Sequence, residues 1–101
     1  MTNLETRLTA LAAAGETISY GALARELGWR INELTTALET LMEEDARAGR
    51  PFRAAVCAQR LSTDGLPAPG FYAKATELGR DILDPAAFAA AERANLRTGA
   101  Q

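Results

Sequence analysis

The stretch ISYGALARELGWRINELTTALETL, residues 18–41, decides the predicted fold of this 101-residue chain. Ser19 can cap a short helix through its hydroxyl. Gly28 follows the last apolar residue of that helix, where a left-handed backbone costs least. A second, longer helix should follow, with Asn32 as its cap and its end near residues 45–46. Two helices joined by a short turn that contains glycine form a helix-turn-helix unit.

A further helix is predicted on each side of this unit. Apolar residues recur at helical spacing over residues 4–12, and Thr2 with Glu5 fits a capping box at the start of that helix. Near the other end of the chain, Asp84 followed by Pro85 is a typical helix start, with the aspartate as cap and the proline in the first turn.

A β-hairpin is predicted between the helix-turn-helix unit and the last helix. Residues 52–61 alternate between two sides with the period of a strand, and residues 62–70 are rich in turn formers. Residues 71–75 are the predicted return strand. The fold class is therefore mainly α with a small β-hairpin (α+β), a winged helix-turn-helix with an added C-terminal helix. One domain is expected over residues 1–97, with a flexible tail over 98–101.

Composition predicts a globular, cytoplasmic protein. Hydrophobic residues make up 48% of the chain, enough to bury a core, and the formal net charge is −2. The single cysteine allows no internal disulfide, which fits a reducing compartment. No apolar run approaches the ~20 residues of a membrane helix, and no secretion signal is visible at the N-terminus. No membrane partner is expected.

The chain lacks the residue types on which most catalytic and metal sites depend. It contains no histidine and one cysteine, which excludes the usual zinc ligand sets and any Ser-His-Asp or Cys-His device. The glycines are scattered at turns and form no phosphate-binding loop. We therefore expect a non-enzymatic protein without cofactor, metal or catalytic residues.

Residues 18–28 resemble the helix-turn-helix entry of winged-helix domains and the corresponding segment of alkylguanine-DNA alkyltransferases and alkyltransferase-like proteins. Residues 56–60, with residues 62–65 and 70–72, more faintly resemble the active-site run of that family, in which the reactive cysteine lies between proline and histidine. Here valine precedes Cys57 and alanine follows it. Without a nearby base the thiol stays protonated, so Cys57 is expected to be a small buried residue. Alkyltransferase-like binding of DNA lesions is the remote alternative.

A second resemblance covers about residues 18–96. Residues 49–52, residues 65–71 and residues 77–79 are similar to small uncharacterised bacterial proteins with a winged-helix core. This resemblance implies a fold and carries no function.

The winged-helix prediction leads to a function in DNA binding or transcription regulation. In such domains the second helix of the unit enters the major groove. Seven residues are the candidates for contacting double-stranded DNA, three polar side chains for the bases and four arginines for the phosphates: Asn32, Thr35 and Thr36, with Arg30, Arg50, Arg53 and Arg60. A homodimer formed through the alanine-rich last helix would place two such helices on neighbouring half-sites.

The acidic second half of the same helix favours a different function. Glu39, Glu43 and Glu44 would repel phosphates, whose neutralisation supplies most nonspecific affinity for DNA. A protein–protein interaction module without DNA binding is therefore the alternative. Trp29 would then lie at the edge of the core or on the partner surface, because aromatic residues are enriched in interfaces.

Overall fold

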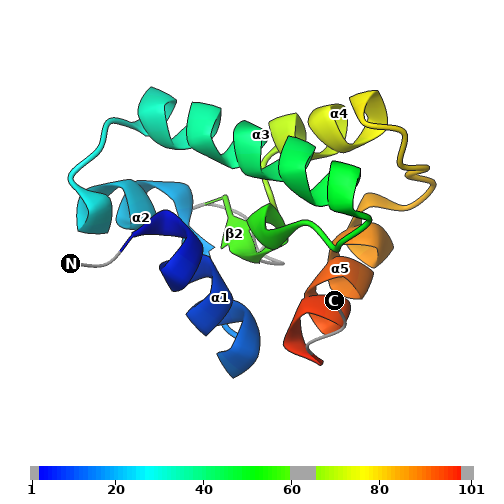
Figure 1. Cartoon of the computed structure of the whole chain (residues 1–101), viewed down its shortest axis with the longest axis horizontal. Helices are drawn as coiled ribbons and strands as arrows, with labels where there is room; N and C mark the ends of the chain where they lie inside the picture. The colour runs from blue at the N-terminus through cyan, green and yellow to red at the C-terminus, as the bar shows by residue number, and fades with distance from the viewer. Residues whose placement is uncertain (1–2, 60–65, 99–101) are drawn as a thin grey trace.

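The computed structural model describes residues 3–59 and 66–98. These residues are mainly helical, with a small two-stranded sheet, which confirms an α+β chain dominated by helices (Figure 1). The elements in chain order are α1 (Leu4–Ala14), β1 (Ile18–Ser19), α2 (Tyr20–Leu27), α3 (Ile31–Ala48), the 3-10 helix η1 (Arg53–Val56), β2 (Cys57–Ala58), α4 (Pro69–Glu77) and α5 (Pro85–Arg97). In this part of the chain, no helix is both long and apolar enough to cross a membrane.

The predicted helix-turn-helix unit is present as α2, a turn and α3. The Ser19 hydroxyl accepts a hydrogen bond from the Ala22 amide at 3.2 Å, and Gly28 ends α2 with φ of 71°. Because a side chain is strained at that φ, glycine is the residue best suited to this turn. The helix α3 then crosses one whole side of the molecule (Figure 1).

Three predicted helix boundaries need correction. Asn32 does not cap α3, because the helix already begins at Ile31 and Arg30 occupies the cap position. The Glu33 carboxylate accepts from the Arg30 amide at 2.8 Å and so satisfies one of the free donors at this end. The helix also continues to residue 48, beyond the predicted end. At α1 the cap is Asn3, while the predicted cap Thr2 lies outside the described residues.

The predicted hairpin is wrong in its second strand and in its pairing. Residues 71–75 belong to α4, which starts at Pro69. Phe71 and Ala75, four positions apart, share its buried face while Ala73 is exposed. The run of five residues that was interpreted as a strand is therefore part of a helix with one buried face. Strand β2 instead pairs in parallel with β1.

The first predicted strand is also mostly replaced. Residues 53–56 form η1, and only Cys57–Ala58 are strand. Ala54, Ala55, Val56 and Cys57 are all buried, so this segment has no outward face of the kind that a period of two implies. Their side chains are small enough for the segment to pass through the centre of the molecule, where η1 contacts α1, α3 and α5. The predicted turn at residues 62–65 lies outside the described residues.

The C-terminal helix forms as predicted and closes the core. Asp84 accepts from the amides of Ala86 and Ala87, and Pro85 occupies the first turn. Phe88 of this helix packs against Phe52 and Phe71, with ring centroids 6.4 and 6.0 Å apart. The helix ends at residue 97, and the predicted tail from residue 99 onward lies outside the described residues.

Candidate functional site

The first half of α3 carries the polar residues predicted to contact bases. Asn32, Thr35 and Thr36 are all exposed, and Arg30 is exposed just before the helix. The hydroxyls of Thr35 and Thr36 donate to the carbonyls of the preceding turn, each at 3.0 Å. These four predicted residues therefore do lie together on one end of the molecule.

Two further predicted residues, Arg50 and Arg53, are held at the opposite end of α3 by the buried carboxylate of Asp45. Arg50 approaches this carboxylate to 3.1 Å and Arg53 to 2.9 Å, and the Arg53 amide also donates to it at 3.0 Å. Arg53 additionally pairs with Glu5 at 3.0 Å. Burial alone would lower the pKa of Arg53, but its bonds to Asp45 and Glu5 raise that pKa above its ordinary value.

Arg50 and Arg53 are thus well separated from the polar residues. Thirteen positions between Asn32 and Asp45 correspond to about 20 Å along a helix. Arg60, the seventh predicted residue, lies outside the described residues. The structure therefore brings together four of the predicted site residues and commits two others to an ion-pair cluster.

The exposed side of α3 is acidic along most of its length. Glu33, Glu39, Glu43 and Glu44 are exposed on it. Glu43 accepts from Lys74 of α4 at 2.7 Å, and this bond lowers the pKa of Glu43 below its usual value.

Cys57 is fully buried in strand β2, as the sequence predicted. Burial raises the pKa of its thiol to about 12, with Arg93 only partly opposing the shift. A buried, protonated thiol is a poor nucleophile. The Cys57 thiol therefore has no exposed surface to which an alkyl group could be transferred.

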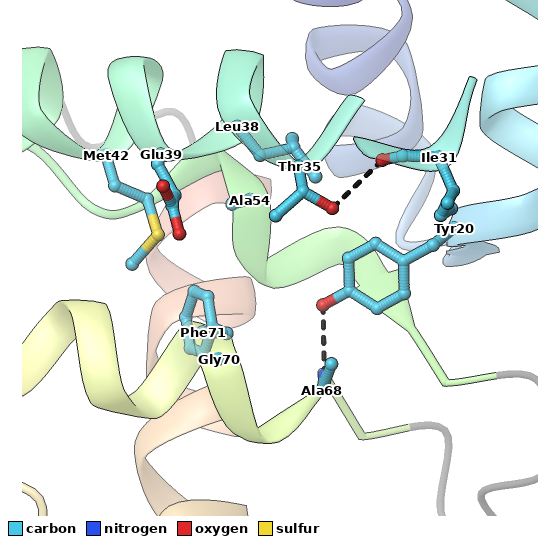
Figure 2. Close-up of a pocket in the computed structure, with 10 residues that line it drawn as sticks. All are labelled: Tyr20, Ile31, Thr35, Leu38, Glu39, Met42, Ala54, Ala68, Gly70 and Phe71. Carbon is cyan, nitrogen blue, oxygen red and sulfur yellow. Dashed lines mark hydrogen bonds between the residues drawn. The ribbon is translucent and has the colours of Figure 1, made fainter. Parts of the chain in front are cut away.

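The feature that the sequence did not reveal is an apolar groove between α3 and the start of α4, here called the α3–α4 groove (Figure 2). It has a volume of about 230 Å³. Its floor comes from three elements, with Leu38 and Met42 from α3, Ala54 from η1 and Phe71 from α4. Figure 2 shows Tyr20 standing at the end of the groove nearest Ile31.

One rim of the groove is formed by α3. Ile31, Thr35 and Glu39 follow each other at four-residue spacing and therefore lie along one edge of the helix. Ile31 leaves 53% of its surface exposed, so the apolar lining of the groove continues onto the surface at this end. Glu39 is exposed and supplies a carboxylate at the same rim.

The other rim is the start of α4, and it is open. Gly70 lines the groove there, and a Cβ atom built on it would meet no atom within 4 Å. The Tyr20 hydroxyl accepts from the Ala68 amide at 3.0 Å, which ties α2 to this end of α4. Burial raises the pKa of Tyr20 to about 12, so the phenol is neutral at physiological pH.

Sequence reasoning missed the groove because its walls come from segments that are far apart in the chain. Residues 71–75, which include Phe71 of the groove floor, were predicted to form a strand instead of part of a helix. The one local signal was Ile31, a large apolar residue between Arg30 and Asn32 at the start of a helix.

Trp29 lines a separate depression of about 480 Å³. It lies beside Leu4, Ala37 and Leu41, between α1 and the other edge of α3, and is 38% exposed. This places Trp29 at the edge of the core. The depression does not share any lining residue with the α3–α4 groove.

Comparisons with protein-family models, with curated proteins and with solved structures gave no match.

Proposed function

We propose that this protein is a non-enzymatic interaction module whose α3–α4 groove receives apolar side chains of a partner protein. The observation that supports this most is Ile31, which is half exposed at the rim of an apolar groove. Exposed apolar surface rimmed by polar residues is typical of interaction sites. Glu39 and Thr35 supply the polar rim.

The size of the groove favours side chains over a complete small ligand. Its volume of about 230 Å³ is below the roughly 300–1,000 Å³ of pockets for drug-sized molecules. Burial of one Leu- or Phe-sized side chain contributes about 1.5–3 kcal/mol. A partner would therefore need to cover Ile31 as well as fill the groove.

The charge distribution supports a protein partner over DNA. Two of the arginines predicted to hold phosphates, Arg50 and Arg53, are bound to Asp45. A phosphate would have to replace these bonds and leave a buried carboxylate without its arginine side-chain partners, which is costly. The exposed carboxylates along α3 would add repulsion.

The proposal is tested by selecting displayed peptides for binding to the wild-type protein and to groove variants. Gly70→Leu should fill the groove, while Gly70→Ala adds only a methyl group to the same position. Selected peptides should bind the wild type and Gly70→Ala and lose at least roughly ten-fold in affinity for Gly70→Leu. Circular dichroism and thermal unfolding would verify that both variants fold. Peptides that bind Gly70→Leu as well as the wild type would contradict the proposal.

Duplex DNA binding is the second candidate, and the exposure of Asn32, Thr35 and Thr36 beside Arg30 favours it. In this case the winged-helix relationship and a homodimer on two half-sites would be part of the proposal. Retardation of random duplex in a gel at low salt, reduced by Arg30→Ala, would support it. The interaction module predicts no retardation.

A further inference from the structure

We infer that the partner of the α3–α4 groove is a basic amphipathic helix. This inference rests on the proposed function and adds the class of partner that the groove accepts. Two properties of the groove support this inference: the nature of its walls and the charge of its rim.

The walls favour a helix over an extended peptide. The groove runs between the faces of two helices, α3 and α4, and its floor consists of apolar side chains. Backbone amides and carbonyls within a helix bond inside that helix. An extended peptide would bring a free donor and acceptor at nearly every residue and would find few partners here. A helix satisfies its own backbone and offers only side chains.

The sheet offers no alternative docking edge of useful length in the described part of the chain. Its two strands, β1 and β2, have two residues each, and β2 is buried. Addition of a peptide strand depends on a row of main-chain hydrogen bonds along an exposed edge. An extended partner therefore gains little from this surface.

The length of the groove suits about three turns of a partner helix. Its α3 wall extends from Ile31 to Met42, which corresponds to roughly 16 Å of helix. Apolar residues spaced by three and four positions would then face the groove in sequence. One would lie over Ile31 and another would enter beside Leu38 and Phe71.

The rim selects for positive charge. Glu39 lines the groove, and Glu43 follows it one turn later on α3. Lys74 of α4 bonds to Glu43 at 2.7 Å and to Glu77 at 3.3 Å. Among the described residues that line the groove, Glu39 is the only charged one, so the lining itself carries one negative charge. Lysine or arginine flanking the apolar stripe of the partner would complement that charge, and opposite charges across an interface favour encounter and orientation.

The experiment uses two displayed libraries, one of helical scaffolds with randomised surface positions and one of short linear peptides. Binders to the full chain are retained only if they fail to bind Gly70→Leu. We expect the surviving ligands to come from the helical library, to carry apolar residues at i and i+3 or i+4, and to be net positive.

A charge variant and a matched control then test the rim. Glu39→Gln should weaken the best helical ligand about two- to five-fold, the range of exposed charge pairs. Glu44→Gln removes the same charge from the other side of α3, where Glu44 is 3.9 Å from Arg53, and should leave affinity unchanged. The effect of Glu39→Gln should shrink as salt is added.

The outcomes separate the two proposals. Net-negative or extended ligands that still depend on the groove would overturn the basic helix and leave the interaction module standing. Ligands that are all insensitive to Gly70→Leu would remove the interaction module itself. Sedimentation of the chain alone provides a further outcome, since self-association abolished by Gly70→Leu would make a second copy the occupant and would overturn the inference.

Discussion

At the scale of single residues, Asp45 explains why a chain rich in arginine presents an acidic helix. Its carboxylate is fully buried and accepts from Arg50 and Arg53. The segment after α3 is thereby bound to the helix, and both guanidinium groups are paired with a carboxylate of the protein itself. Sequence reasoning assigned these arginines to the surface because a buried partner cannot be seen from spacing alone.

Asp45→Asn should therefore destabilise the protein strongly. The substitution keeps the shape of the side chain and removes the charge, so Arg53, which is only 17% exposed, loses its main partner. Breaking a buried ion pair from one side typically costs about 3–5 kcal/mol. Urea denaturation would measure the change. Glu44→Gln, at the next position and exposed, should stay within about 0.5 kcal/mol of wild type, and equal stability of the two variants would contradict this account.

Cys57 makes stability depend on pH in the alkaline range. Burial raises the pKa of its thiol to about 12 in the folded protein, whereas an unfolded cysteine titrates near 8.5. Below about pH 8.5 both states hold the proton and stability is unaffected. As pH rises toward 12 only the unfolded state releases it, so the free energy of unfolding falls by about 1.4 kcal/mol per pH unit.

Cys57→Ala should reduce that slope. Urea midpoints would be compared between about pH 8.5 and 10. The midpoint should fall steeply with pH for the wild type and less steeply for the variant, even if the two proteins differ in stability at neutral pH. Parallel slopes would contradict the assigned role. The partly buried Tyr20, whose pKa is also raised to about 12, contributes in both proteins only above about pH 10, outside this comparison.

At the scale of elements, helix ends could be predicted from sequence better than strands. Ser19, Gly28 and Asp84 each act through their own backbone neighbours, so the sequence around them contains the necessary information. The return strand failed because residues 71–75 are too few to distinguish a period of two from a helical face. Their conformation depends on Pro69 at the helix start and on packing against distant aromatic residues.

Ser19→Ala tests the entry into α2. The serine hydroxyl accepts from the Ala22 amide, and loss of such a cap usually costs about 1 kcal/mol. Thr40→Ala is a suitable control, since it also removes a hydroxyl, but one that bonds a carbonyl in the middle of α3. Thermal unfolding should show a clear loss for the first variant and little change for the second. A loss of equal size in both would mean that Ser19 is not a distinctive cap.

At the scale of the whole molecule, the candidate site could not be predicted because it exists only where α4 packs beside α3. Spacing within α3 indicated correctly which residues face outward, including Asn32 and Thr36. It could not indicate that Gly70 and Phe71 would form the opposite wall, since no local rule connects them to Ile31. A groove between helices is a property of tertiary packing.

Three large apolar side chains are exposed among the described residues, and they should differ in their effect on binding. Ile31 borders the α3–α4 groove, whereas Leu83 is 99% exposed in the segment before α5. Ile31→Ser should weaken a groove-dependent ligand roughly ten-fold, the equivalent of about 1.4 kcal/mol of lost apolar contact. Leu83→Ser, the matched control, should bind normally, and both should keep wild-type stability within about 0.5 kcal/mol. Calorimetric titration would measure both affinities, and equal loss in the two variants would argue against the groove.

The most direct test of the central claim locates a bound ligand on the surface of the protein. The measurement is a set of nuclear Overhauser contacts between a selected peptide and the labelled methyl groups of Ile31 and Met42. The account predicts contacts to both methyl groups, because Ile31 lies at the rim and Met42 on the floor of the α3–α4 groove. Contacts to the side chain of Trp29 or Leu83, with none to Ile31 and Met42, would contradict it.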